Sequence, residues 1–196
     1  MGYFTDRIFQ GVTADQLQRK VKANLALYEP GTVGREVAVN LVHGHGCVAL
    51  EMGYLNREEE VLRSVAYQLG GIWMDVRYQD GDCWDLSVYK GAEHMCSHSV
   101  NPWAHEVRFK YNQDHVDYRI NKLCKLWPAQ AERMRPYLLP WREPVRKLGL
   151  TRFVARKGKA YPTDEYTYGD ADQIHDFLRV FGIDNHSVRT RIGPVL

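Results

Sequence analysis

The spacing of apolar residues along the chain predicts four helices, covering approximately residues 13–29, 56–70, 116–127 and 170–182. In each stretch the apolar side chains recur every three or four positions, which places them on one face of a helix. These stripes are Leu17, Val21, Leu25 and Tyr28; Leu62, Val65, Ala66 and Leu69; Val116, Ile120, Leu123 and Trp127; and Ile174, Phe177, Leu178 and Phe181. Thr13 and Gln16 have the spacing of a capping box at the first helix, and Asp170 with Gln173 repeats it at the last.

Between the first two helices, strict alternation of apolar and polar residues predicts a β-hairpin over residues 37–52. Its apolar positions are Val37, Val39, Leu41, Val48, Leu50 and Met52. An antiparallel register must bring all of them to the same side of the sheet. Pairing Leu41 with Val48 does so, and it predicts a four-residue turn from His43 to Gly46.

A second alternating stretch, residues 73–98, predicts a three-stranded antiparallel meander. Its inner face carries Met74, Val76, Tyr78, Trp84, Leu86 and Val88. Placing Tyr78 opposite Trp84 matches the two inner faces and leaves a three-residue loop, Asp80 to Asp82. Gly91 and Ala92 are predicted to form the second turn, because a type II′ turn places glycine at its first central position.

Together these elements predict an α+β fold with a largely antiparallel sheet, made of the hairpin and the meander after an N-terminal strand, and packed against several helices. The main domain is expected over residues 1–127. Prolines at 128, 136, 140 and 144 divide residues 128–196 into short helical pieces. We expect this C-terminal region, helical or mixed in structure, to pack on the main domain rather than to fold independently.

Composition is consistent with a single buried core. The 196 residues are 44% apolar and 26% charged, and the formal charge of +2 does not by itself indicate a nucleic-acid or membrane partner. No secretory leader pattern and no run of about 18 apolar residues is present, so no membrane partner is expected, and export by a leaderless route stays an alternative. The four cysteines are widely spaced, which favours reduced thiols and a cytoplasmic location.

The predicted register also defines a second, polar and aromatic face of the meander. It carries Trp73, Asp75, Arg77, Asp85, Tyr89, His94 and His98. Because antiparallel sheets often leave one face in solvent, we predict that this face binds another protein, with Trp73 and Tyr89 as contact anchors. A catalytic or metal site is the alternative, since Asp85 lies between Arg77 and His98 and would orient the imidazole for proton transfer.

The turn sequence HGHG resembles the His-x-His element of several metallohydrolases, which use further ligands elsewhere in the chain. A metal-dependent hydrolase using His43, His45, His94 and His98 is therefore one alternative function, with His43, His45 and His98 as the metal ligands. The other interpretation is a plain turn, because glycine follows each histidine.

Residues 133–159 contain nine Lys and Arg residues and one acidic residue, Glu143. Aromatic residues are interleaved, as in surfaces that follow phosphates and stack bases, so nucleic-acid binding is a second alternative. The positions expected to carry it are Arg142, Arg146, Lys147, Arg152 and Arg156. The acidic residues that follow, from Asp164 to Asp176, would neutralise this charge if they folded back on it.

A helix followed by IWMDVRYQDGDCWDLSVYKGAEHM resembles a pattern in uncharacterised bacterial α+β proteins, some of them of toxin-immunity type. The resemblance covers approximately Asn56 to Pro102. It implies a protein-binding role without diagnostic catalytic residues, and it assigns no cofactor.

We therefore predict a non-enzymatic, cytoplasmic bacterial protein without a cofactor. It is expected to bind another macromolecule through the sheet face, with immunity-type inhibition as one such role. The metal-dependent hydrolase and the nucleic-acid binder remain open beside it.

Overall fold

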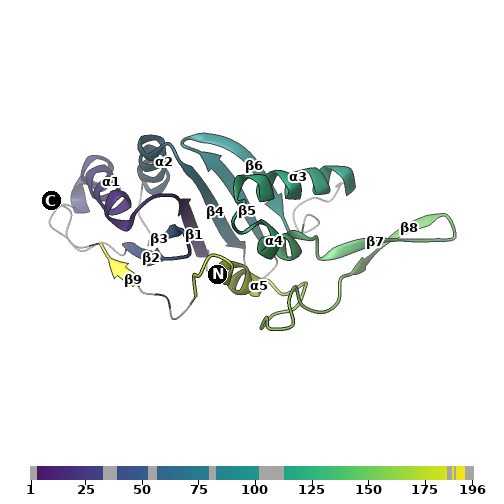
Figure 1. Ribbon diagram of the computed structural model, residues 1–196. Coiled ribbons are helices and arrows are strands. Elements are labelled where there is room, and N and C mark those ends of the chain that lie inside the picture. The colour runs from purple at the N-terminus through teal and green to yellow at the C-terminus, as the bar shows by residue number, and fades with distance from the viewer. Residues whose placement is uncertain are drawn as a thin grey trace. The chain divides into compact units, whose positions relative to one another are not determined.

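The computed structural model describes residues 4–32, 39–52, 57–79, 83–101, 113–184, 187 and 189–192 (Figure 1). Within them lie five α-helices, a seven-stranded sheet and a separate two-stranded hairpin, which confirms the predicted α+β class. The chain forms two compact units, one of residues 5–76, 87–95 and 181–196 and the other of residues 1–4, 77–86 and 96–180. The boundary expected after residue 127 stays a prediction.

The large sheet has the strand order β6-β5-β4-β1-β3-β2-β9. Its strands are β1 (Phe4–Gln10), β2 (Val39–His43), β3 (Cys47–Met52), β4 (Ile72–Gln79), β5 (Cys83–Lys90), β6 (Glu93–Ser99) and β9 (Arg189–Arg191). The pairs β1–β3, β2–β3 and β2–β9 are antiparallel. The N-terminal strand β1 thus joins the predicted hairpin to the predicted meander.

The β2–β3 hairpin has a register that differs by two residues from the predicted one. Leu41 lies opposite Leu50 rather than opposite Val48. The turn is therefore the pair His45 and Gly46, and Gly46 has a φ of +70°. A shift of two residues leaves every side chain on its original face, so both registers satisfy the alternation of apolar residues.

The meander has the predicted strands, with β4 ending at Gln79 and β5 beginning at Cys83. The loop of residues 80–82 lies outside the described residues, and the pairing of Tyr78 with Trp84 stays a prediction. The second turn is at Gly91 and Ala92, and Gly91 has the expected positive φ, +55°.

Helices α1 (Ala14–Tyr28) and α2 (Glu58–Leu69) belong to the first unit. Thr13 caps α1 with the complete predicted capping box, and Gly70 ends α2 in the left-handed conformation. The short 3₁₀ helix η1 (Pro30–Thr32) follows α1. The core of this unit contains Phe9, Leu17, Val21, Leu25, Leu41, Val48, Leu50, Val61, Leu62, Val65, Ala66, Trp73 and Ile192.

The second unit contains α3 (Gln113–Leu126), α4 (Ala131–Met134), the 3₁₀ helix η2 (Arg135–Leu138) and α5 (Gln173–Arg179). Helix α5 begins three residues later than predicted, because Asp170 Oδ1 accepts a 3.0 Å hydrogen bond from the Asp172 amide in a local turn instead of capping a helix. The predicted apolar faces of α3 and α5 are buried. No helix in the described ranges combines the length and the apolarity needed to cross a membrane.

The short helical pieces expected after residue 128 are present at residues 131–138 and at α5, residues 173–179. Residues 142–155 instead form a β-hairpin of β7 (Arg142–Lys147) and β8 (Leu150–Ala155). Each strand pairs only with the other, in a sheet of two strands. We call this hairpin the arm.

Candidate nucleic-acid interface

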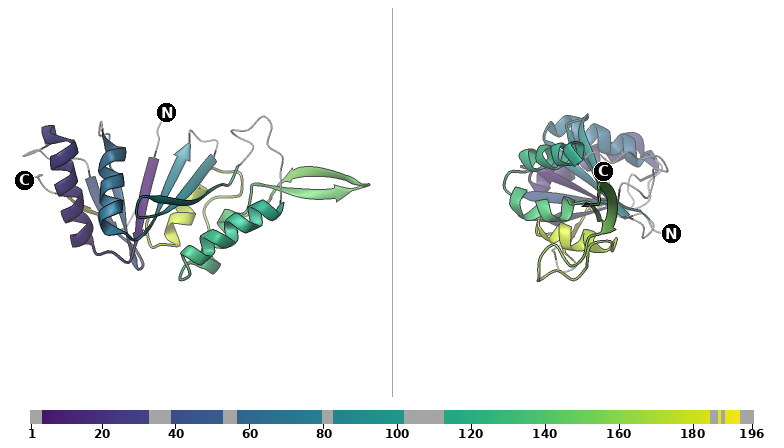
Figure 2. Two further views of the ribbon diagram at one scale, coloured as in Figure 1. Left: turned by 90° about the horizontal axis from the view of Figure 1, so that it is seen from above. Right: turned by 90° about the vertical axis from the view of Figure 1, so that its right-hand side faces the viewer.

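The arm is a two-stranded ribbon that is exposed on both faces. Figures 1 and 2 show it extending away from α3 and α4, which belong to the same unit. The pairing runs from Arg142 opposite Ala155 to Lys147 opposite Leu150 at the tip. Every residue from 144 to 155 is exposed, so neither face of the ribbon is covered by the described protein.

Four cationic side chains, Arg142, Arg146, Lys147 and Arg152, are distributed along the arm, and all four are exposed. Opposite residues share a face of a ribbon and successive residues alternate, so Lys147 and Arg152 lie on one face and Arg142 and Arg146 on the other. None of the four forms an ion pair with a residue in the described part of the chain. Both faces of the arm are therefore positively charged.

The arm also concentrates exposed apolar surface. The described residues include eight large apolar side chains that are exposed, and five of them belong to the arm: Val145, Leu148, Leu150, Phe153 and Val154. An isolated two-stranded hairpin is only marginally stable in water. Exposed apolar side chains on such an element are typical of a surface that becomes covered by a partner.

The root of the arm is anchored firmly in its unit. The amide of Trp141 donates to Val100 O at 2.9 Å, and its indole donates to Gln173 Oε1 at 3.2 Å. On the other strand, the amide of Arg156 donates to Trp141 O at 2.7 Å, and the Arg156 guanidinium carbon lies 5.6 Å from the centroid of the Tyr168 ring. A fixed root allows the arm to present its side chains in a defined direction.

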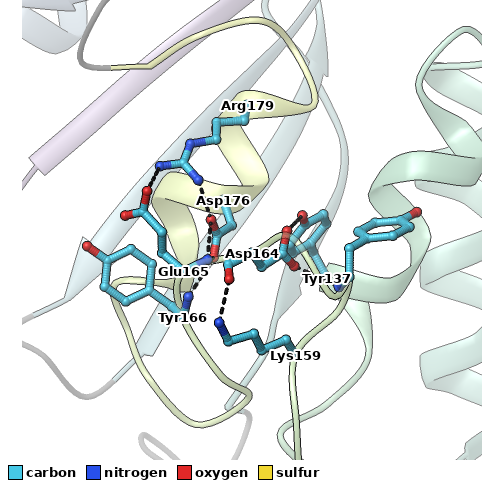
Figure 3. Close-up of polar contacts among 8 residues, drawn as sticks. Tyr137, Lys159, Asp164, Glu165, Tyr166, Asp176 and Arg179 are labelled. Carbon is cyan, nitrogen blue, oxygen red and sulfur yellow. Dashed lines mark hydrogen bonds and ion pairs between the residues drawn. The ribbon is translucent and has the colours of Figure 1, made fainter.

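The acidic residues that follow the arm form hydrogen bonds and ion pairs within their own unit. Asp164 accepts a hydrogen bond from the Tyr137 hydroxyl at 2.8 Å (Figure 3). It accepts a second one, also at 2.8 Å, from the Tyr161 amide. Burial, and then the hydrogen bond to Asp164, raise the pKa of Tyr137, so its hydroxyl stays a donor. Asp176 is 1% exposed and accepts from two backbone amides, those of Glu165 and Tyr166.

Arg179 completes the same network. It donates to Asp176 Oδ1 at 2.9 Å and contacts Glu165 Oε1 at 2.5 Å. Asp176 and Glu165 thus fasten the loop before α5 to that helix, and Asp164 connects the same loop to Tyr137 of η2. They do not fold back onto the four exposed cations of the arm, which was the alternative suggested by their position in the sequence.

Arg156 is the one residue of the predicted nucleic-acid set that the structure places differently. It is half-buried, its guanidinium pairs with Glu143 at 3.0 Å, and it donates to Pro140 O at 3.2 Å. Arg156 is therefore part of the root of the arm and not of its exposed surface.

Three of the seven residues predicted for the exposed sheet face are buried. Trp73, Asp75 and His98 are only 5%, 2% and 4% exposed. Trp73 stacks between Phe9 and Tyr89 in the core beneath α1 and α2. The prediction of a solvent face is therefore wrong at these positions, because elements from distant parts of the chain cover it.

Other features of that face agree with the predicted register. The row of Trp73, Tyr89 and His94 is present, with ring centroids 4.4 Å and 5.3 Å apart. Arg77 and His94 are exposed, while Asp85 and Tyr89 are half-buried. Partner binding by these four residues stays a prediction.

His98 has a structural role. Its Nε2 lies 2.6 Å from the carbonyl oxygen of Leu138, and burial lowers its pKa to about 4, so the ring is neutral at physiological pH. His43 and His45 are exposed. Among the described residues, no group of three or more His, Cys, Asp or Glu side chains is arranged to hold a metal ion.

The HGHG sequence has a packing explanation. A side chain at Gly44 would overlap the carbonyl oxygen of Phe181, and the His45 amide donates to that same oxygen at 2.6 Å. Gly44 thus permits close backbone contact with residues 181–183, and Gly46 supplies the positive φ of the turn.

All four cysteines lie outside disulfide bonds, and all four are buried. Burial raises the pKa of Cys47 to about 12, and it also raises the pKa of Cys96 and Cys124. Since the thiolate is the reactive form, these three thiols are poor nucleophiles.

The cations of the interface were predictable from the sequence, but their arrangement on a two-stranded ribbon was not predicted. The available signal was Leu148 and Gly149 between two segments that contain Val145, Phe153 and Val154, since glycine at the second central position is typical of a two-residue hairpin turn.

No family model, no curated protein and no solved structure matches this chain. The resemblance of residues 56–102 to bacterial immunity-type proteins therefore stays a prediction.

Proposed function

We propose that this protein binds double-stranded DNA through the arm. The observation that carries the proposal is the exposed two-stranded ribbon, whose four cations have no anionic partner among the described residues. A polyanion such as DNA would pair with these cations. Contacts between Lys or Arg and phosphates release counterions, and this supplies most of the non-specific affinity for DNA.

The charge distribution favours a groove over a flat anionic surface. Arg142 and Arg146 are on one face of the ribbon and Lys147 and Arg152 on the other, so anions on both sides are contacted at once. The two strands that flank a groove of duplex DNA provide this arrangement. An acidic patch on a globular protein would contact one face only.

The dimensions of the arm also fit duplex DNA. Six residues per strand span about 20 Å at about 3.3 Å per residue. Two-stranded ribbons bind in DNA grooves, whereas the deep, narrow major groove of A-form RNA does not admit side chains for reading bases. The exposed Phe153 and Val154 would contact sugars and base edges there. This function agrees with the expectation that the chain binds a macromolecule, and a cytoplasmic location stays a proposal beside it.

Fluorescence anisotropy with a labelled duplex of about 25 base pairs tests the proposal, with salt raised from about 50 to about 200 mM. Four phosphate contacts predict a slope of log K against log salt of about −4. The double variant Arg146→Gln/Arg152→Gln should bind at least about tenfold more weakly at about 0.1 M salt and lower the slope by about 2.

The matched control is Arg63→Gln/Lys125→Gln, which removes two exposed cations from α2 and α3. Both variants change the net charge equally, so an effect confined to the arm variant assigns binding to the arm. Equal losses, salt-insensitive binding, or a preference for single-stranded DNA over the duplex would contradict the proposal.

A further inference from the structure

The tip of the arm contains an unusual residue for its backbone conformation. The two-residue turn consists of Leu148 and Gly149, with φ values of +52° and +79°. Positive φ at both central positions is the requirement of a type I′ turn, which strongly favours Asn-Gly or Asp-Gly. Leu148 is the only described residue other than glycine with a positive φ.

In the described structure, no burial of the Leu148 side chain offsets its unfavourable backbone conformation. The Leu148 side chain is 93% exposed, the highest value among the exposed large apolar residues. Leucine is therefore unfavourable at this position both for its backbone and for its contact with water. Strain retained at a ligand-binding element is a recognised mark of function.

We infer that Leu148 is an apolar wedge that enters the minor groove, unstacks one base step and kinks the duplex; this inference rests on the proposed DNA-binding function. Proteins that bend DNA from the minor groove insert Leu, Phe, Ile, Met or Pro between bases. Leu148 lies in the turn, beyond the last cross-strand pair of the arm. It is therefore placed to enter a groove ahead of the side chains of the two strands.

The residues next to the tip suit this role. Lys147 and Leu150 form the last cross-strand pair, and Arg146 with Thr151 forms the pair before it. The two cations would hold phosphates on either side of the kinked step, while Leu150, 63% exposed, extends the apolar surface of the wedge. Unstacking costs free energy, and it is repaid when the bent duplex contacts more of the protein.

Energy transfer between dyes at the two ends of a duplex of about 30 base pairs measures the bend directly. The full-length protein should raise the transfer efficiency by an amount that corresponds to a bend of about 20–90°. Leu148→Asn should bind within about threefold of the parent affinity, because its four cations are intact, but it should lose most of the bend. Leu148→Met is the matched control, because methionine remains an apolar wedge and should retain the bend.

Asparagine is favoured in this turn, so Leu148→Asn should melt at or above the parent temperature, which excludes misfolding as the cause of a lost bend. If the parent protein binds the duplex without bending it, or if Leu148→Asn bends it equally, the wedge is refuted while DNA binding stands. If the parent protein binds no duplex, the proposed function itself has failed. Binding to vesicles containing phosphatidylserine that Leu148→Asn abolishes, without DNA binding, would assign the tip to a membrane surface and overturn the inference.

Discussion

The guanidinium of Arg156 contacts the carboxylate of Glu143 at 3.0 Å, across the root of the arm. Glu143 is the only acidic residue between positions 133 and 159, so this ion pair uses the one carboxylate that would oppose the cations of the ribbon. Arg156 also lies over Tyr168, which fixes its direction. The root of the arm is therefore anchored and its charges are paired, whereas the rest of the ribbon is exposed and positively charged.

Glu143→Gln should strengthen DNA binding, because it removes the carboxylate while keeping a polar side chain next to Arg156. One additional net positive charge near the phosphates predicts a roughly three- to tenfold gain in affinity at low salt and a slope steeper by about 0.9. Anisotropy titrations at several salt concentrations measure both. Glu59→Gln, an exposed site on α2, is the control and should change affinity much less. An unchanged affinity for Glu143→Gln would argue against DNA contacts at the root.

Gly44→Ala should destabilise the protein by more than about 2 kcal/mol, because the new methyl group would overlap Phe181 O and Cys47 Sγ in a tightly packed region. Urea denaturation followed by tryptophan fluorescence measures the loss. Gly31→Ala is the control, since nothing lies within 4 Å of a side chain at that position. If both variants are equally stable, the close approach of residues 44 and 181 is absent in solution.

Asp6 should make stability fall as pH rises toward neutrality. Burial, and then the charge of Glu51 opposite it, raise the Asp6 pKa from 3.8 to about 7. The folded state therefore binds a proton that the unfolded state releases between pH 3.8 and about 7, and the free energy of unfolding decreases by about 1.4 kcal/mol per pH unit in that window.

Asp6→Asn mimics the protonated carboxyl group and removes this titration. Its free energy of unfolding should match that of the parent near pH 4 and exceed it near pH 8, by up to about 4 kcal/mol. Urea midpoints at several pH values give the difference. A difference that does not vary with pH would show that Asp6 titrates normally.

His98 should have the opposite effect. Burial lowers its pKa from 6.5 to about 4, so the unfolded state binds the extra proton between these values and stability is lost as pH falls. Because Asp6 produces a slope of opposite sign in the same window, the comparison is between Asp6→Asn and the double variant Asp6→Asn/His98→Gln. The first should lose about 1.4 kcal/mol per pH unit on acidification, and the second should not. Glutamine keeps a donor for Leu138 O. Parallel pH profiles of the two proteins would be inconsistent with a neutral, buried His98.

Much of the local structure was predictable because it depends on neighbours in the sequence. The capping box of Thr13 and Gln16, the apolar stripe of α3 and the row of Trp73, Tyr89 and His94 are all confirmed. The cations of the candidate site were identified as well, since a run of like charge is visible in any chain. Their arrangement on a ribbon was missed, because a hairpin exposed on both faces shows no alternation of buried and exposed residues.

Away from the arm, the sequence by itself determined the helices α1, α2, α3 and α5 and which face of each strand of the hairpin and the meander is apolar, since these follow from periodicities of 3.6 and 2 along the chain. Only the tertiary structure decided the hairpin register, where a shift of two residues leaves the faces unchanged. It also decided that Trp73, Asp75 and His98 are buried and that residues 144–155 of the arm are exposed. Burial depends on which distant segments pack against a surface, and no pattern of neighbouring residues contains that information.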